Sequence, residues 1–277
     1  MLRDGRPHLP RRTAPDLIPI VQLNLPTIGL DAYTSRSQRA RVATESWAAK
    51  NLYCPNCTCN TLTAYAAGKP ALDYACESCD APFQLKSQSK PFTSRIVDAG
   101  YDAMIRSIDA DRTPNLWALQ YGMESWKVEN VFLIPHFAFS RSMIEKRKPL
   151  NPTARRAGWV GCNLLLNRIS PDVRIDYVRN SVPVNPKIIR QRYNSLRPLG
   201  SLGVKKRGWT LDVLNGIRSL GKKEFSLSDV YTLESEFQKL HPANQNVQPK
   251  IRQQLQELRD IGLLKFLRPG HYELSTL

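Results

Sequence analysis

The first two thirds of the chain show two spacings of apolar residues, one typical of helices and the other of strands. Ala40, Ala43 and Trp47 recur at helical spacing and predict a helix over residues 34–50. A second apolar stripe at helical spacing predicts another helix, across 94–111. The members of this second stripe are Val97, Tyr101, Met104 and Ile108.

Segments rich in β-branched and aromatic residues lie between and after these helices and predict strands. The predicted strands span residues 61–66, 70–75, 83–87, 115–121 and 127–135. A turn at Gly68 and Lys69 is expected between the first two of them. The order is helix, three strands, helix, two strands, which indicates an α/β (α+β) domain.

Near residue 204 the pattern changes to three amphipathic helices followed by a hairpin. A capping box of Ser226 and Asp229 is expected to open the second helix. Pro249 is expected to open the third helix, and Gly262 to end it. Two short apolar strands around a Pro-Gly turn follow. This order of elements predicts a C-terminal winged helix.

The chain is therefore expected to contain two domains, at 21–195 and 204–277. Residues 1–20 are rich in Arg and Pro and are interpreted as a flexible basic arm. Residues 188–207 mix Gly, Pro, Ser and basic side chains, which is typical of a connecting stretch. We place the linker itself at 196–203.

The charge of the chain favours a polyanionic partner. Forty Lys and Arg residues against twenty-four Asp and Glu residues give a formal net charge of +16. No run approaches the roughly 18 consecutive apolar residues of a membrane span, and no secretory signal or lipidation motif is evident. We therefore expect a cytoplasmic protein, a monomer, whose partner is nucleic acid and not a membrane.

Four of the six cysteines have the spacing of a structural zinc site. They form two Cys-x-x-Cys pairs with eighteen residues between the pairs. Disulfides are the alternative, but a chain without a secretory signal has little use for them. Cys59 could compete as a ligand, and Cys162 is expected to be a buried thiol. The predicted zinc ligands are Cys54, Cys57, Cys76 and Cys79.

The second Cys-x-x-Cys pair lies at the tip of a predicted hairpin whose arms carry Asp73, Gln84 and Lys86. These residues match D-x10-(E/Q)-x-K, the pattern of the PD-(D/E)xK phosphodiesterases. Hard oxygen ligands hold a divalent ion, and a neighbouring lysine orients water and offsets phosphate charge. The pattern alone is weak, because a solvated pair of strands gives the same spacing by chance.

Two further segments are candidates for nucleic-acid binding. Arg155, Arg156 and the glycine-flanked Trp159 could contact phosphates or bases, although Trp159 could equally fill the core. The third C-terminal helix directs Ile251, Leu255 and Leu258 inward and a polar set outward. A solvated or protein-binding surface would look the same. The outward residues are Arg252, Gln253, Gln256 and Arg259.

Longer stretches carry a more specific resemblance. They are SRSQRARVATESW, YCPNC, LDYACESCDAPFQLKS, NPTARRAGWVGCN, RGWTLDVLN and KIRQQLQELRD. Over nearly the whole chain after the basic arm, the sequence resembles the DpnI-type methyl-directed restriction endonucleases. The resemblance implies a zinc-stapled PD-(D/E)xK nuclease core with a C-terminal winged helix. It also implies a type II site-specific deoxyribonuclease that cleaves double-stranded DNA at GATC sites bearing N6-methyladenine, using Mg²⁺ or Mn²⁺.

Carried over to this sequence, the resemblance makes Asp73 a metal-binding acid, Lys86 the motif lysine and the four paired cysteines the zinc ligands. Gln84 departs from the motif, which has glutamate at this position. Its amide oxygen can bind a metal but supplies no charge, so Gln84→Glu is expected to lower the Mg²⁺ requirement. Glu45 on the preceding helix could supply a compensating carboxylate.

Two other functions remain open from the sequence. A non-cleaving reader or regulator of methylated DNA would keep both DNA-binding modules while having lost the full metal site at Gln84. A zinc-ribbon transcription factor would explain the cysteines and the charge, but it leaves Asp73 and Lys86 without a role.

Overall fold

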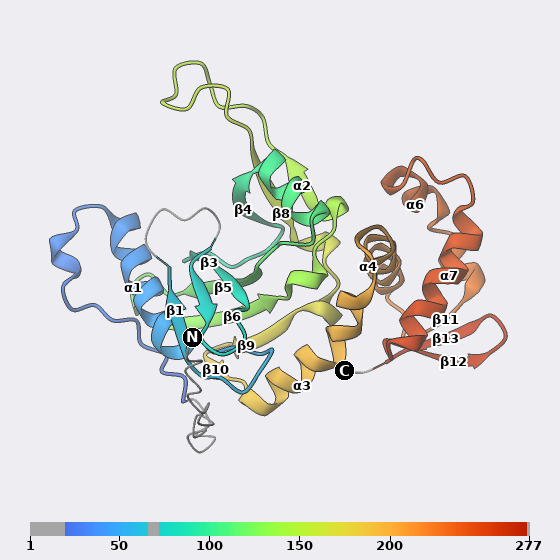
Figure 1. The fold of residues 1–277 in the computed structure, drawn as a ribbon, viewed down its shortest axis with the longest axis horizontal. Coiled ribbons are helices and arrows are strands. Elements are labelled where there is room, and N and C mark those ends of the chain that lie inside the picture. Colours follow the sequence, from blue (N-terminus) through green and yellow to red (C-terminus); the bar gives the residue numbers. More distant parts are fainter. Residues whose placement is uncertain (1–19, 66–71, 276–277) are drawn as a thin grey trace, which may run out of the picture.

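A computed structural model describes residues 20–65 and 72–275. Nearly all of the predicted basic arm, and the predicted turn at Gly68 and Lys69, lie outside these residues. The larger part of the described chain is a mixed α/β unit, and the smaller part is a C-terminal winged helix (Figure 1). The predicted fold class is therefore confirmed.

A seven-stranded sheet forms the centre of the α/β unit, in the order β1-β2-β3-β5-β6-β9-β10. Only the β3–β5 pair is parallel, because the chain leaves the sheet after β3 and returns through another layer. The strands are β1 (Leu62–Ala64), β2 (Tyr74–Cys76), β3 (Pro82–Gln88), β5 (Asn115–Tyr121), β6 (Val128–Ile134), β9 (Ile175–Arg179) and β10 (Val182–Pro183).

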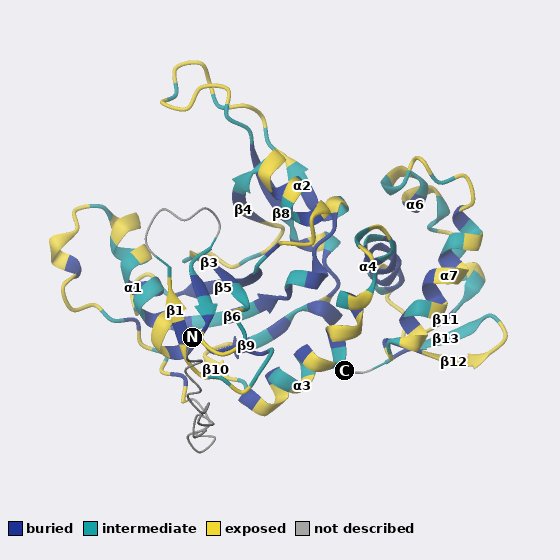
Figure 2. Ribbon diagram, viewed as in Figure 1, coloured by how far each residue is buried: buried dark blue, intermediate teal, exposed yellow. Residues whose placement is uncertain are grey.

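The core of this unit lies around β5, every residue of which is buried (Figure 2). Trp117 on β5 stacks on Phe83 of β3, with ring centroids 4.2 Å apart. Helix α1 (Arg36–Asn51) confirms the helix predicted over 34–50, and it buries Ala43 and Trp47. The Thr44 and Ser87 hydroxyls lie 3.0 Å apart and join α1 to β3.

The helix predicted over 94–111 is wrong in its first half. Residues Arg95–Gly100 form strand β4, and helix α2 covers only Tyr101–Asp109. Val97, counted in the helical stripe, is 56% exposed, whereas Met104 and Ile108 are buried as expected. One strand residue, Val97, and the three stripe residues of the following helix together resemble one longer helical stripe. Strand β4 belongs to a second sheet, β4-β8-β7, with β7 (Ile144–Lys146) and β8 (Gly161–Leu165).

The connecting stretch predicted over 188–207 is also wrong. Helix α3 (Pro186–Leu196) occupies its first half and packs against β9, with Ile189, Tyr193 and Leu196 buried. Basic and polar residues on the exposed side of α3 concealed this apolar stripe. Short 3-10 helices complete the unit: η1 (Leu30–Ala32), η2 (His136–Ala138), η3 (Arg141–Met143), η4 (Leu166–Arg168), η5 (Pro171–Val173) and η6 (Arg197–Ser201).

The winged helix contains four helices and a three-stranded sheet, β11-β13-β12. The capping box of Ser226 and Asp229 is present, but the predicted second helix is split in two near Thr232. Gly262, with φ 79°, follows the third predicted helix as expected. The elements are α4 (Val204–Ser219), β11 (Glu224–Ser226), α5 (Leu227–Tyr231), α6 (Glu234–Leu240), α7 (Val247–Asp260), β12 (Leu264–Arg268) and β13 (His271–Leu274).

Polar contacts join α4 to the α/β unit. Arg207, which is 1% exposed, forms an ion pair with Asp111. Arg218 donates its Nε–H to Asp172 at 2.6 Å, and Ser142 donates to Asp212 at 2.5 Å. These bonds fix the side of α4 that faces the α/β unit, and α7 lies on the other side of α4 (Figure 1).

No helix among residues 20–65 and 72–275 is both long enough and apolar enough to cross a bilayer.

Candidate active site and nucleic-acid interface

Asp73 is fastened to strand β3 by its backbone and by its side chain. It lies immediately before β2, and its backbone N–H donates to the Phe83 carbonyl at 2.9 Å. Its Oδ2 accepts a hydrogen bond of 2.7 Å from the Leu85 N–H. These two bonds hold the Asp73 carboxylate beside the β3 residues with which the sequence pattern paired it.

Gln84 and Lys86 lie on the face of β3 opposite Phe83, as strand alternation requires. Gln84 is 5% exposed, and the Lys86 side chain is 27% exposed. Both contact a residue that the sequence pattern missed, Asp98 of β4. Gln84 Nε2 donates to Asp98 Oδ1 at 3.0 Å, and Lys86 Nζ lies 2.7 Å from the same oxygen. We call Asp73, Gln84, Lys86 and Asp98 the polar cluster.

Burial shapes the electrostatics of the polar cluster. It raises the pKa of Asp73 above the ordinary value for aspartate, and the Asp98 charge raises it further. The Leu85 N–H and the Lys86 ammonium act in the opposite direction and lower this pKa. A cation placed beside Asp73 would therefore relieve an unfavourable concentration of negative charge.

Glu45 approaches the polar cluster from helix α1. The Tyr74 hydroxyl, on β2, donates to the Glu45 carbonyl at 2.8 Å and holds the helix against the hairpin. Burial is the main cause of the raised Glu45 pKa, and the Asp73 charge also raises it. The Glu45 carboxylate lies 3.7 Å from the Arg41 guanidinium, which lowers that pKa. Glu45 is thus near Asp73 but already shares its charge with Arg41.

The donor atoms of the polar cluster suit a hard divalent cation. Asp73 offers a carboxylate, and Gln84 has an amide oxygen that remains available once its nitrogen has bonded to Asp98. Asp98 Oδ2 is buried and has no hydrogen-bond partner among the described residues. An unpaired buried carboxylate oxygen is unfavourable unless a cation or a donor satisfies it. The residues therefore fit the ion that the resemblance implies.

The four paired cysteines come together at the tip of the β2–β3 hairpin. Their sulfur atoms all lie within 4.8 Å of one another, with Cys54–Cys79 at 3.6 Å and Cys57–Cys76 at 3.5 Å. Four thiolates bound about 2.3 Å from one tetrahedral zinc lie about 3.8 Å apart. The cluster can thus hold a metal ion such as zinc. Cys59 instead directs its Sγ to the Thr61 carbonyl.

Hydrogen bonds from helix α3 and the residue that follows it hold the segment of the first Cys-x-x-Cys pair. Arg190 donates to the Cys57 carbonyl at 2.9 Å and to Asn60 Oδ1 at 2.7 Å. Arg197, just after α3, donates to the Asn56 carbonyl at 2.8 Å. Part of the stretch predicted to be a linker therefore holds the segment that carries Cys54 and Cys57.

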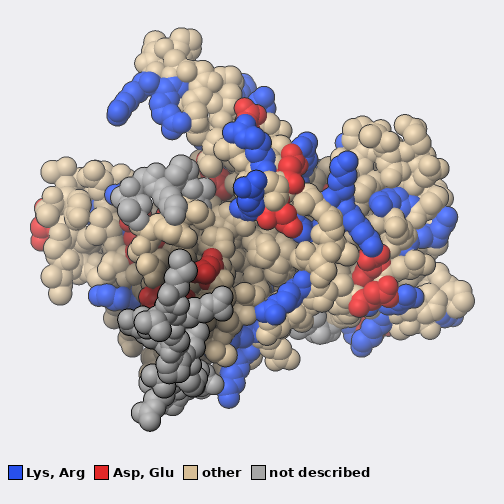
Figure 3. Space-filling model, viewed as in Figure 1, with Lys and Arg blue, Asp and Glu red and all other residues tan. Residues whose placement is uncertain are grey.

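Arg155, Arg156 and Trp159 lie in the loop between β7 and β8, which projects from the molecule (Figure 1). Arg155 and Arg156 are exposed, and Figure 3 shows basic side chains on this loop. Trp159 is half-buried at the base of the loop, with the Arg156 guanidinium 4.6 Å from its ring centroid. A Cβ at Gly161 would lie 2.8 Å from the indole, so glycine lets the ring lie against the backbone.

Helix α7 presents the polar face that the sequence predicted. Ile251, Leu255 and Leu258 are fully buried. The outward residues Arg252, Gln253, Gln256 and Arg259 are all exposed. Arg252 contacts the Tyr231 hydroxyl, and Arg259 pairs with Asp260 at 2.8 Å. Helix α7 lies on the opposite side of α4 from strand β3 (Figure 1).

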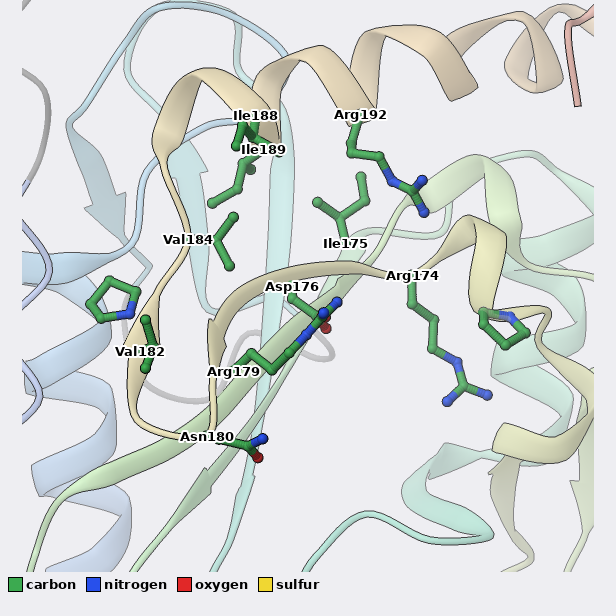
Figure 4. A pocket seen from close by; sticks show the side chains of 12 residues that line it. Arg174, Ile175, Asp176, Arg179, Asn180, Val182, Val184, Ile188, Ile189 and Arg192 are labelled. Atoms are coloured by element: carbon green, nitrogen blue, oxygen red, sulfur yellow. The ribbon is translucent and has the colours of Figure 1, made fainter. Parts of the chain in front are cut away.

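A pocket of about 770 Å³ between β9, β10 and α3 contains three arginines but none of the predicted site residues (Figure 4). Each arginine already bonds within the protein. Arg179 Nε donates to Asp176 at 2.8 Å, Arg174 to the Ile169 carbonyl at 2.8 Å and Arg192 to the Asp172 carbonyl at 3.1 Å. Arg174 and Arg192 therefore stabilise the segments around η4 and η5, and Arg179 bonds within its own strand, β9.

Comparison with known families agrees with both parts of the structure. Residues 21–201, which contain the polar cluster and the cysteines, match the DpnI family, described as the Dam-replacing family. Residues 205–274 match the Dam-replacing HTH domain. The resemblance drawn from the sequence is confirmed, and the chain belongs to the DpnI, or Dam-replacing, family.

Proposed function

We propose that the protein is a methyl-directed type II restriction endonuclease that hydrolyses double-stranded DNA at GATC sites carrying N6-methyladenine. The observation that supports this best is the polar cluster itself. The segment just before β2 and strand β3 bring together an acid, an amide oxygen and a lysine in the D-x10-Q-x-K pattern.

In this proposal, Asp73, Gln84 and Lys86 of the cluster each have a distinct task, and Glu45 acts beside them. The Asp73 carboxylate and the Gln84 amide oxygen would hold the divalent ion, and the Lys86 ammonium would orient the attacking water and offset charge on the scissile phosphate. A bound Mg²⁺ or Mn²⁺ would polarise the phosphate and offset the charge that develops on it. Glu45 adds negative charge from α1.

Zinc in the cysteine cluster has a structural task. Four thiolates fill its coordination shell, so no position is left for a substrate. The second Cys-x-x-Cys turn joins β2 to β3, the strands that present Asp73, Gln84 and Lys86. We infer that zinc holds the hairpin in the register that the cluster needs.

Two surfaces would read the DNA. The outward face of α7 carries arginine and glutamine, which suit guanine and adenine edges and phosphates. The β7–β8 loop carries Arg155, Arg156 and Trp159 on the α/β unit. We propose that methylated DNA is held by both.

A digest of matched plasmids, one adenine-methylated at GATC and one unmethylated, tests the proposal. With Mg²⁺ or Mn²⁺, wild-type protein is expected to cut the methylated plasmid alone, and Asp73→Ala to cut neither. Methyl-selective binding without cleavage under any divalent ion would favour the reader function. Equal cutting of both plasmids would overturn the methyl-directed activity.

A further inference from the structure

Asp98 reaches the polar cluster from a different sheet than its partners. Val97 pairs with Asn163 and Gly100 with Gly161, so β4 contains one residue more than β8 between these pairs. Such a bulge redirects the side chains beside it, and bulges are frequent next to active sites. The Asp98 side chain is completely buried. A buried carboxylate is strongly unfavourable unless it is paired, so its contacts are informative.

Both contacts of Asp98 are made to the same oxygen. Oδ1 accepts from the Gln84 amide and from the Lys86 ammonium, whereas Oδ2 has no hydrogen-bond partner among the described residues. A carboxylate can only accept, so Gln84 must present its Nε2 to Asp98 and direct its Oε1 elsewhere. A glutamate at position 84 would instead bring two carboxylates together.

We propose that Asp98 is a positioning residue of the nuclease site, which supplies the acidic charge that position 84 lacks and orients the Gln84 amide and the Lys86 ammonium. This inference rests on the proposed function. By formal charge, Asp73, Asp98 and Lys86 together equal the Asp, Glu and Lys of the family motif. The second acidic residue of the site therefore lies on β4 in this protein, whereas the motif has it on β3. Gln84→Glu would therefore add charge at the site, but it would place that charge against Asp98.

Thermal unfolding of four proteins without added Mg²⁺, with zinc retained, tests the pairing apart from catalysis. The proteins are wild type, Gln84→Glu, Asp98→Asn and the double variant. Gln84→Glu is expected to lower the Tm because its new carboxylate faces Asp98. The double variant is expected to recover most of that loss, because the acid–amide hydrogen bond forms again with donor and acceptor exchanged. A double variant that melts no higher than Gln84→Glu would overturn the assignment.

Nicking of adenine-methylated plasmid across a Mg²⁺ series tests the effect on the site. Asp98→Asn is expected to raise the Mg²⁺ concentration for half-maximal rate by at least about tenfold while leaving DNA affinity almost unchanged, since it removes charge beside the ion. The double variant should restore most of the wild-type requirement. A lower maximal rate with an unchanged Mg²⁺ requirement, or no rescue in the double variant, would indicate a merely structural Asp98.

Asp102→Asn is the matched control, since Asp102 is an exposed acid on the neighbouring helix α2. It should leave both the Tm and the Mg²⁺ requirement close to wild type. Wild-type protein that never cleaves would overturn the proposed function alone, because the unfolding series involves neither DNA nor catalysis. Failure of the proposed function can therefore be distinguished from failure of the Asp98 assignment.

Discussion

The polar cluster and the outward face of α7 are both rich in polar side chains, but their surroundings differ. In the cluster, Gln84 and Asp98 are buried and bonded to each other, and Lys86 is held at the same carboxylate. On α7, Gln253 and Gln256 are exposed on a helix whose other face fills the core. One group of side chains is fixed before any ligand arrives, and the other remains adaptable.

This difference matches the two tasks that the proposed function requires. Groups that stabilise a transition state act best when the protein has already oriented them, because no reorganisation is needed during the reaction. Groups that read base edges must reach into a groove and adjust to it. Substitutions in the cluster should therefore affect stability and catalysis together, whereas substitutions on α7 should affect binding alone.

The largest effect is expected from Lys86→Ala. Cleavage of methylated plasmid should fall by roughly 10²- to 10³-fold or more, because a charged donor at the scissile phosphate is lost. The free energy of unfolding should also fall, by about 3 kcal/mol or more, since the buried Asp98 loses its counter-charge. Plasmid nicking and denaturant unfolding measure the two effects. Lys90→Ala, at an exposed position just beyond β3, is the control. Full cleavage by Lys86→Ala would contradict the assignment.

The sequence predicted the α7 face more completely than the cluster. An outward helical face follows from the spacing of Ile251, Leu255 and Leu258 within one element, so local periodicity is sufficient. The motif spacing also brought Asp73, Gln84 and Lys86 together, because one hairpin carries all three. The pairing of β4 with β8 brings Asp98 to the cluster, and β8 lies more than sixty residues later in the chain than Asp98. No local pattern encodes such a pairing.

The two wrong elements failed for related reasons. The spacing of Val97 and Tyr101 predicts a helix that starts near residue 94, yet tertiary pairing with β8 makes Arg95–Gly100 a strand. The sequence predicts a linker at helix α3 because the exposed side of this helix is basic and polar. Its buried Ile189 and Tyr193 gain their environment from β9, which is remote in the sequence.

Removal of one cysteine should have the next largest effect. Cys76→Ala is expected to release zinc and to lower the Tm at the same time, because structural zinc binding contributes directly to folding free energy. Zinc content measured by a metal-sensitive dye, together with thermal unfolding, checks this. Cys59→Ala is the matched control, since the Cys59 sulfur lies outside the cluster. Unchanged zinc content and Tm in Cys76→Ala would exclude the zinc site.

Arg190→Ala should destabilise the cysteine cluster less than Cys76→Ala does. It removes the hydrogen bonds from α3 to the Cys57 carbonyl and Asn60, and a charged hydrogen bond of this kind contributes about 1.5–3 kcal/mol. We expect zinc to be retained at equilibrium but lost faster to a chelator. Lys187→Ala, at an exposed position of the same helix, is the control. Equal rates of zinc loss in Arg190→Ala and wild type would show that α3 does not stabilise the segment that carries Cys54 and Cys57.

On the outward face of α7, Arg252→Ala should weaken DNA binding without changing the Tm. If Arg252 contacts a phosphate, the slope of log K against log salt should decrease in magnitude by about 0.9. Arg259→Ala should have a smaller effect, because Arg259 is already paired with Asp260. Fluorescence anisotropy at several salt concentrations measures both. An unchanged slope in Arg252→Ala would place the DNA elsewhere and favour a protein-binding role for this face.

The smallest effect is expected from Trp159→Ala. The Trp159 side chain is intermediate in burial between the polar cluster and the outward face of α7. Trp159 is half-buried against Gly161, so its loss should lower stability by less than the roughly 3 kcal/mol of a buried aromatic core residue. If the indole covers one adenine methyl group, contact with that methyl contributes about 0.8 kcal/mol, or roughly a fourfold preference for methylated DNA. Competition binding with methylated and unmethylated duplexes should show that preference reduced by about this factor. An unchanged preference together with a large fall in Tm would make Trp159 a core residue and leave methyl recognition to other residues.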